Sequence, residues 1–347
     1  MNNEINVLHV TKWYPHKADP QNGIFVQKHI ESTGVEPVVI GFLSFSGKPE
    51  ISGNTTIYGA KQMSNATKLA IFTAAIAQHK PRVVHFHCFA PDLLPLLLYA
   101  KSKRIKTLHT EHGSAFLKHR LHLLKGWRKK APKWYFSKVD LVLPISPLLE
   151  EGIRALSPKS TTRLLPNIVT PFTSSIAEER LTKQFCVVAD VVFATKQQDK
   201  IVEVFRKIPR AKAELHFFGG GPDLRELEER CRKDFNIFVH GRKTNPEVLQ
   251  LLPKFDALVL YSAYETFGIT IFEARQAGLW AIHSSGLGGQ PWYDDGCLEV
   301  SSEEELLTAM NQVLNLEAAS KAAFPDLSSL AIGSMLKDLY REIVLKS

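Results

Sequence analysis

The sequence is poor in cysteine and has no long apolar run. Its four cysteines, Cys88, Cys186, Cys231 and Cys297, show no Cys-x-x-Cys spacing. Their scattered positions argue against a disulfide framework and a zinc site, and they are typical of a protein in a reducing cytoplasm. The most apolar stretch, LLPLLLYA, is far shorter than the roughly 20 residues that span a bilayer. Because MNNEINVLHVT also lacks the regions of a signal peptide, we expect a cytoplasmic location.

Motifs that bind common cofactors are missing as well. The glycines of FFGGGPDL lack the third glycine of a dinucleotide fingerprint, which weighs against a nicotinamide oxidoreductase. No Asp-x-Asp occurs, so a divalent metal that holds a diphosphate is not expected. His85 and His87 lie on one face of a predicted strand. Either could be a donor, a base, a ligand or a structural residue, and no third ligand at metal spacing is evident. We expect no cofactor and no metal.

Acidic residues are absent from one basic stretch. Residues 112–139 hold eight Lys or Arg and no Asp or Glu. Residues 1–175 hold 23 basic against 10 acidic residues (+13), and the remainder holds 20 against 25 (−5). Leucines and tryptophans interleave with the bases, so residues 117–138 either bind an anionic membrane surface or form an ordinary solvated face. No nucleic-acid-binding module is recognisable, and no nucleic-acid partner is expected.

A chain of 347 residues exceeds what one core usually supports, so two domains are expected. Apolar β-rich runs alternate with helical patterns, which predicts two doubly wound parallel sheets covered on both faces. We expect domains at 1–167 and 184–326, a linker at 168–183, and a closing helix at 327–347 that packs back on the first domain. The predicted strands are 5–11, 35–42, 82–87, 105–112, 139–146, 185–192, 213–219, 236–241, 257–262 and 279–285. The predicted helices are 24–33, 63–79, 92–102, 117–136, 147–156, 197–208, 223–233, 245–253, 270–278 and 302–314.

The stretch YETFGITIFE places two glutamates around a glycine between a predicted strand and a predicted helix. The amides of residues 267–270 would form an open helix start, which suits a phosphate or diphosphate, and Gly268 allows close approach. Glu265 would lie above the crevice, where hydroxyls or a cation are its expected partners. For Glu273 a capping box with Thr270 is the favoured alternative.

Two further residues follow predicted strands. Lys196 stands between a strand and a helix, where a basic side chain could offset phosphate charge without a metal, and a solvated turn lysine is the alternative. His112, in TEHG, ends a strand and could act as donor or base, or be structural.

Taken together, these segments resemble glycosyltransferase family 4, the retaining enzymes of the GT-B fold. Residues 265–274 carry its E-x-F-G-x-x-x-x-E-A element, followed by AG and GLGG. FFGGGPDLRELEE and HGRKTNPEVLQLL look like the preceding family segments, and NGIF, VVHFH, TEHG, PIS and LLPN occur in family order. The resemblance implies two Rossmann-like domains that face an interdomain cleft, the first for the acceptor and the second for a nucleotide sugar.

The resemblance also implies roles for donor-binding residues. Glu273 would hold the ribose hydroxyls, Glu265 the donor sugar, and Lys196 the leaving diphosphate. The remaining donor-binding positions would be Phe267, Gly268, Ile269 and Gly219.

In the first domain, the resemblance places His112 near the donor sugar, with a catalytic role beside Glu265. Gly23 would open the helix nearest the acceptor and the diphosphate. The implied reaction moves a sugar, with retention, from a nucleotide sugar to a hydroxyl of a glycan or lipid-linked acceptor of the cell surface. A UDP-sugar is preferred over GDP-mannose.

The sequence departs from the family pattern at two positions that leave an alternative open. Asp190 stands about where the family has an arginine that binds the diphosphate. Arg242 or Lys243 could take over the role of that arginine. Trp292 replaces the usual glutamate after GG-x-P. The alternative is a catalytically silent scaffold that binds a nucleotide sugar or a partner protein.

Overall fold

The computed structural model describes residues 5–171, 181–320 and 322–345. Contacts between residues divide the chain into two compact units. Unit 1 comprises Met1–Ile168 together with Leu327–Ser347, and unit 2 comprises Val169–Asp326. Residues 172–180 of the expected linker lie outside the described residues.

Unit 1 is built on a seven-stranded sheet in the order β3-β4-β2-β1-β5-β6-β7. All neighbouring strands are parallel except β3, which pairs antiparallel with β4 at the edge. The central strands are almost fully buried, as expected for a parallel sheet covered on both faces. The strands are β1 (Val7–Thr11), β2 (Val38–Leu43), β3 (Glu50–Ser52), β4 (Thr55–Gly59), β5 (Val83–His87), β6 (Lys106–Glu111) and β7 (Leu141–Pro144).

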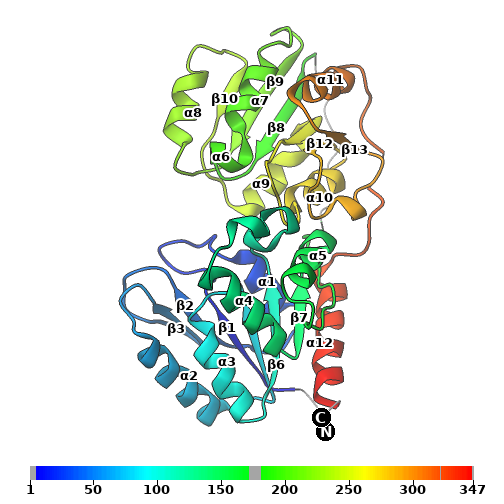
Figure 1. The fold of residues 1–347 in the computed structure, drawn as a ribbon. Coiled ribbons are helices and arrows are strands. Elements are labelled where there is room, and N and C mark those ends of the chain that lie inside the picture. The colour runs from blue at the N-terminus through cyan, green and yellow to red at the C-terminus, as the bar shows by residue number, and fades with distance from the viewer. Residues whose placement is uncertain (1–4, 172–180, 321, 346–347) are drawn as a thin grey trace. The chain divides into compact units, whose positions relative to one another are not determined.

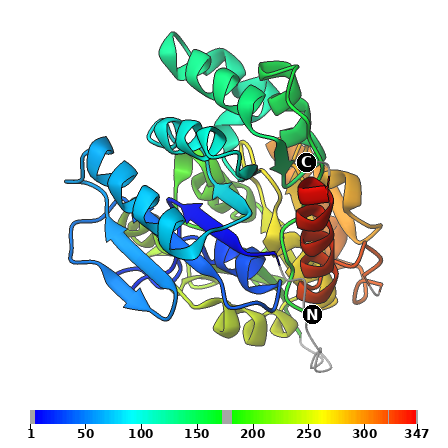
Figure 2. The same cartoon turned by 90° about the horizontal axis from the view of Figure 1, so that it is seen from below.

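Helices cover both faces of this sheet (Figure 1). Aromatic contacts place α2, α3 and α4 on the face of Phe86, and α1 and α12 on the opposite face. The terminal helix α12, drawn in red in Figure 2, is tied to the sheet by a 2.7 Å hydrogen bond between Tyr340 Oη and His85 Nδ1. The helices are α1 (Ile24–Glu31), α2 (Asn65–His79), α3 (Leu93–Ser102), η1 (Ser114–Phe116), η2 (Lys118–Leu123), α4 (Trp127–Lys138), α5 (Pro147–Leu156) and α12 (Ser329–Leu345).

Unit 2 is an all-parallel sheet in the order β10-β9-β8-β11-β12-β13. One core cluster contains side chains of α7, α8 and α11, and the other contains those of α9 and α10, so helices again cover both faces. The strands are β8 (Lys183–Val188), β9 (Ala213–Phe218), β10 (Ile237–Val239), β11 (Ala257–Leu260), β12 (Trp280–Ser284) and β13 (Cys297–Val300). The helices are α6 (Phe193–Lys196), α7 (Gln198–Phe205), α8 (Leu224–Cys231), α9 (Asn245–Leu251), η3 (Leu252–Lys254), α10 (Ile269–Gln276), η4 (Gln290–Trp292) and α11 (Glu303–Leu314).

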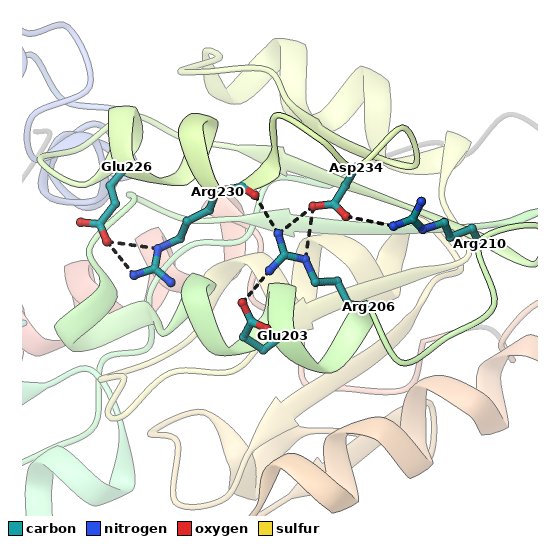
Figure 3. A network of polar contacts seen from close by, with 6 residues as sticks. All are labelled: Glu203, Arg206, Arg210, Glu226, Arg230 and Asp234. Carbon is teal, nitrogen blue, oxygen red and sulfur yellow. Dashed lines mark hydrogen bonds and ion pairs between the residues drawn. The ribbon is translucent and has the colours of Figure 1, made fainter.

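An ion-pair network joins α7 to the end of α8 on the surface of unit 2 (Figure 3). The Arg206 guanidinium donates to Glu203 at 2.6 Å, to Asp234 at 2.8 Å and to the Arg230 carbonyl at 2.7 Å. Because one guanidinium serves both elements, the network fixes α7, which begins just after Lys196, against α8.

Two sequence predictions of the fold were wrong in detail. The helix predicted at 117–136 is divided: the 3₁₀ helix η2 ends at Leu123, and α4 begins after its N-cap Gly126, whose φ of 55° and ψ of −131° suit glycine. The strands β3, β4 and β13 were not predicted, because they are short and carry little apolar alternation.

In each sheet the strand order reverses at one point, where ligands of doubly wound folds bind. In unit 1 the reversal lies between β1 and β5, and in unit 2 it lies between β8 and β11. These two places define where functional side chains should gather.

Candidate active site

The reversal point of unit 2 brings together a lysine and a glutamate that are 69 positions apart. Lys196 ends α6 after β8, and Glu265 lies in the loop after β11. Their side chains form an ion pair, each about one-fifth exposed. The two loops are also joined by a 2.8 Å hydrogen bond from the Ala263 amide to the Thr195 carbonyl. Lys196 is therefore an ion-paired cation at the reversal point of the sheet and not a solvated turn lysine.

Glu265 is held in its ionised form. Burial alone would raise the pKa of Glu265, but the charge and hydrogen bond of Lys196 and the amides of Thr266 and Phe267 outweigh it and lower that pKa. The Gly288 amide donates to the Glu265 carbonyl at 3.0 Å and fixes the GLGG loop beside it. The site thus presents a carboxylate that can accept hydrogen bonds from sugar hydroxyls.

The helix after Glu265 starts with open amides. Gly268 is the N-cap residue of α10, with φ 79° and no side-chain cap. Among the described residues, none accepts a hydrogen bond from the amides of Gly268 or Ile269. These two donors can bind an anion, since an uncapped helix start is electropositive. The amide of Phe267 faces Glu265 instead.

The capping-box interpretation of Glu273 was wrong. Because α10 begins at Ile269, Thr270 lies inside its first turn and cannot be the N-cap residue. Glu273 is 2% exposed and accepts a 3.0 Å hydrogen bond from Asn245 Nδ2 at the start of α9. A buried carboxylate beside the start of α9 suits the binding of neighbouring hydroxyls.

Replacing Gly268 by alanine should destabilise the protein by more than the cost of its positive φ alone. A Cβ atom at Gly268 would lie 2.5 Å from Tyr293 Oη, which donates to the Phe267 carbonyl at 3.0 Å. We expect Gly268→Ala to lower the free energy of unfolding by roughly 3 kcal/mol, the combined cost of backbone strain and overpacking.

The matched control for this variant is Gly278→Ala. Gly278 has a similar φ of 83° but no heavy atom within 4 Å of the added Cβ. It should lose only the roughly 1–2 kcal/mol of a left-handed backbone. Equal losses in urea unfolding of the two variants would refute the contact with Tyr293.

The glycine turn after β9 packs closely against the loop that follows β8. A Cβ atom at Gly219 would lie 1.8 Å from the Ala189 carbonyl oxygen, so no other residue fits there. A Cβ at Gly220 would lie 2.9 Å from Arg242 Nε, which places the Arg242 side chain over the turn. The Arg242 guanidinium pairs with Asp190 at 3.3 Å, with both side chains more than half exposed. Lys243 is exposed beside them.

In unit 1, His112 and Gly23 lie close to one another. Gly23 is the N-cap of α1 with φ 67°, and a Cβ there would lie 2.3 Å from the carbonyl carbon of Trp13. His112 is 6% exposed, and its ring lies 4.5 Å from that of Phe25 on the same helix. Burial, and then the charges of neighbouring histidines, lower the pKa of His112 well below its usual value. Neither ring nitrogen has a partner within the described chain, and both are buried, so His112 is a neutral imidazole without a hydrogen bond.

The structure brings a third histidine to the two that the sequence singled out. His9 pairs in register with His85, and His9 Nδ1 lies 3.2 Å from His87 Nε2. One nitrogen from each of the three lies within 4.8 Å of the others, a spacing that could hold a metal. His85 already bonds Tyr340 and Thr110, so metal binding would cost one of those bonds. The sequence missed His9 because parallel pairing of β1 with β5 cannot be read from spacing along the chain.

Family models match both halves of the chain. Residues 32–171 match the model described as Glycosyltransferase Family 4, and residues 171–323 match the model described as Glycosyl transferases group 1. The chain belongs to the family 4 glycosyltransferases. This glycosyltransferase has the GT-B fold, since both its units are doubly wound sheets. A search of curated proteins finds no match to its sequence.

Solved structures share this fold at low sequence identity. Sucrose-phosphate synthase from Thermosynechococcus elongatus is 16% identical with a TM-score of 0.77, and the match covers 99% of this glycosyltransferase and 100% of that chain. The UDP-forming α,α-trehalose-phosphate synthase from Burkholderia xenovorans, in complex with glucose-6-phosphate, is 11% identical with a TM-score of 0.74 over 97% and 100%. Anabaena HepE, in complex with UDP and glucose, is 13% identical with a TM-score of 0.68 over 99% and 98%.

Proposed function

We propose that this glycosyltransferase moves a sugar, with retention, from a nucleotide sugar to a hydroxyl of a glycan or lipid-linked acceptor in cell-surface glycan synthesis. The observation that carries the proposal is the Lys196–Glu265 ion pair at the reversal point of unit 2, beside the open amides of Gly268 and Ile269. A cation and two amide donors suit a diphosphate, and an adjacent ionised carboxylate suits sugar hydroxyls.

Each side chain has a chemical task in this proposal. Lys196 stabilises the negative charge that develops on the departing diphosphate, and binding the donor there loosens its pair with Glu265. Glu265 then accepts hydrogen bonds from the donor sugar, while Glu273 holds the ribose. His112, neutral and without a hydrogen-bond partner in the described chain, is kept as a proposed ligand-binding residue of unit 1. Positioning and electrostatic stabilisation supply the rate enhancement.

A panel of nucleotide sugars tests this function. We expect a UDP-sugar to raise the melting temperature most, since HepE is in complex with UDP and glucose and the trehalose-phosphate synthase is UDP-forming. A ligand at 100 times its dissociation constant stabilises the folded state by about 2.7 kcal/mol. With acceptor present, the same donor should be consumed and the free nucleotide released. The proposal fails if no nucleotide sugar stabilises the protein.

Asp190 and Trp292 favour a second candidate, a silent scaffold that binds a nucleotide sugar or a partner protein. Asp190 places an acid near the proposed phosphate site, and the Trp292 ring packs 5.7 Å from that of Phe267. Donor binding without any nucleotide release over a long time course, with a broad acceptor mixture, would select this candidate.

Arg242 is proposed to supply the second cation that Asp190 cannot. The exposed Asp190–Arg242 pair is worth less than about 1 kcal/mol, so exchanging Asp190 for a phosphate costs little. Arg242→Ala should weaken nucleotide-sugar binding by about 10- to 100-fold, because one charge-assisted hydrogen bond is lost. Isothermal titration of the donor measures this effect.

A rescue variant and a control variant test whether the effect belongs to Arg242. Asp190→Arg combined with Arg242→Ala should restore much of the affinity, because it returns a cation to the same place. Arg232→Ala, which removes an exposed arginine at the end of α8, is the control. Unchanged affinity in Arg242→Ala would exclude a phosphate role for that arginine.

We further propose that the protein acts in the cytoplasm, peripherally at the inner face of the membrane. Lys129, Lys130 and Lys133 are exposed and form no ion pair with any described residue, and large apolar side chains are exposed among them: Leu123, Trp127 and Trp134. Within the described chain, no helix is both long and apolar enough to cross a membrane.

Neutralising Lys129, Lys130 and Lys133 should weaken sedimentation with anionic vesicles by about 100-fold, at roughly 1 kcal/mol for each lysine. High salt should have a similar effect, since surface charges are screened. Neutral vesicles are the control. Binding that ignores both salt and these substitutions would show that the basic segment has another purpose.

The proposed mechanism uses no metal and no cofactor. Lys196, Arg242 and the α10 amides supply the positive charge that a divalent ion would otherwise provide at the diphosphate. Chelator-treated protein should therefore retain its transfer activity.

A further inference from the structure

Unit 1 has a cavity of about 520 Å³ on the edge of its sheet where the strands end. It opens between the loops that follow β1, β2, β5 and β6, with η1 and the start of α4 as its outer wall. This volume is in the range of small-molecule sites. Its lining comprises Lys12, Trp13, Ser44, Cys88, Phe89, Pro91, Glu111, Gly113, Ser114, Ala115, Phe116, Leu124, Trp127, Arg128 and Pro132.

The cavity coincides with the reversal point of the unit 1 sheet. Lys12 follows β1 and Phe89 follows β5, the two strands between which the strand order changes. Cys88, which stands between the end of β5 and Phe89, has a φ of 59°, which is rare for a residue with a side chain. This left-handed turn lies where doubly wound sheets bind ligands.

Most of the cavity wall is apolar and packed in advance. The Phe89 ring lies 5.8 Å from that of Phe116 and 5.7 Å from that of Phe136, which in turn lies 5.2 Å from Phe116. A Cβ at Gly152 would lie 1.8 Å from the Phe116 carbonyl oxygen, so α5 presses directly on this wall. A purely polar oligosaccharide would leave this surface poorly matched, whereas an apolar group would bury it.

Two cations border this apolar wall without a carboxylate partner. Neither Lys12 nor Arg128 forms an ion pair with any residue in the described ranges. The Arg128 guanidinium lies over the Trp127 ring at 5.9 Å.

Glu111, the acid in the lining, is buried and hydrogen-bonded within the protein. It accepts hydrogen bonds from the amides of Phe89, His112 and Gly113, and its Oε2 lies 3.0 Å from His109 Nε2. The cavity therefore offers Lys12 and Arg128 to a ligand, while the carboxylate of Glu111 is held by donors of the protein itself.

The cavity opens beside the basic segment described above. Trp127, 61% exposed, belongs both to the cavity wall and to the exposed apolar side chains of that segment. An amphiphile in a bilayer could thus extend from the membrane surface into unit 1 without leaving apolar contacts.

We propose that the acceptor is an anionic amphiphile, a lipid with a phosphate or diphosphate headgroup, whose apolar chain lies against Trp127 and Phe116 while its phosphate lies between Lys12 and Arg128. This inference rests on the proposed function, since it names the acceptor of the same enzyme.

Simple amphiphiles test the inference without knowledge of the natural acceptor. Decyl phosphate, ethyl phosphate and decyl glucoside, each below its micelle concentration, are titrated into the full chain. Decyl phosphate should bind at least about tenfold more tightly than the short phosphate or the neutral glucoside, because it alone satisfies both the apolar wall and the cations.

Variants locate the binding. Trp127→Ala should weaken decyl phosphate about tenfold and leave ethyl phosphate unchanged, and Lys12→Ala with Arg128→Ala should abolish the preference for phosphate over glucoside. Leu98→Ala and Lys103→Ala, exposed positions of α3 and of its C-cap that do not line the cavity, are the matched controls. Equal affinity in all variants, or losses only in the two controls, would overturn the proposal.

Donor binding in the same samples separates this inference from the proposed function. Nucleotide-sugar binding without decyl phosphate binding would refute the amphiphilic acceptor alone. Decyl phosphate binding without any nucleotide-sugar binding would refute the proposed function and leave the unit 1 site standing.

Discussion

Substituting Lys196 or Glu265 by alanine should lower the rate of sugar transfer by about 100- to 1000-fold, the usual cost of removing one preorganised electrostatic contact from an active site. Lys196 faces the departing diphosphate, so its loss should reduce kcat most. Glu265 holds the donor sugar, so Glu265→Gln, which keeps hydrogen bonds and removes the charge, should retain more activity than Glu265→Ala. Initial rates of nucleotide release with saturating acceptor measure both effects.

Stability must be followed in parallel, because either substitution leaves a partly buried charge without its partner. Thermal unfolding of each variant shows whether lost activity reflects lost fold. Lys200→Ala, which removes a partly exposed lysine of the neighbouring helix α7, is the matched control and should keep its activity. Near-normal turnover in both Lys196→Ala and Glu265→Ala would rule out the proposed role of the ion pair.

Mild acid should destabilise unit 1 strongly. Burial lowers the pKa of His9 from 6.5 to about 3 and that of His29 to about 4, although the Pro166 carbonyl partly offsets burial at His29. Below pH 6.5 the unfolded chain therefore binds protons that the folded chain does not, and stability falls as pH falls. Each histidine costs about 1.4 kcal/mol per pH unit, so these two remove roughly 3 kcal/mol for each unit.

The pKa values of His85, His87 and His112 are also lowered well below 6.5, chiefly by burial, and should steepen the loss. Because small proteins are stable by only about 5–15 kcal/mol, we expect unit 1 to unfold near about pH 5. Urea unfolding between pH 7 and pH 4, with hydrogen exchange to locate the change, measures this effect. His29→Gln should reduce the proton dependence by one proton, and constant stability down to pH 4 would contradict buried neutral histidines.

Much of the fold could be predicted from the sequence, because long helices and buried strands carry strong apolar patterns. The helix predicted at 147–156 has these bounds in the structure, since Ser146 caps it and Pro147 begins it. Short elements were missed because their pairing partners, and not their own residues, define them. Gly126 shows the converse, where one backbone conformation divides a helix that the basic pattern alone predicts as continuous.

The candidate site was predictable only residue by residue. Lys196 and Glu265 each follow a predicted strand, but their ion pair depends on strand order, which the sequence does not give. The same holds for His9 beside His87 and for Arg242 beside Asp190. The capping box was wrong because a two-residue shift of a helix start moves Thr270 from the N-cap into the first turn.

A crystal structure of the protein with its most stabilising nucleotide sugar would test the function most directly. We predict a diphosphate within hydrogen-bond distance of Lys196 Nζ and of the amides of Gly268 and Ile269, with Glu265 on the sugar and Glu273 on the ribose. A ligand bound elsewhere in unit 2, or an unchanged Lys196–Glu265 pair that does not touch the donor, would contradict the proposed donor site.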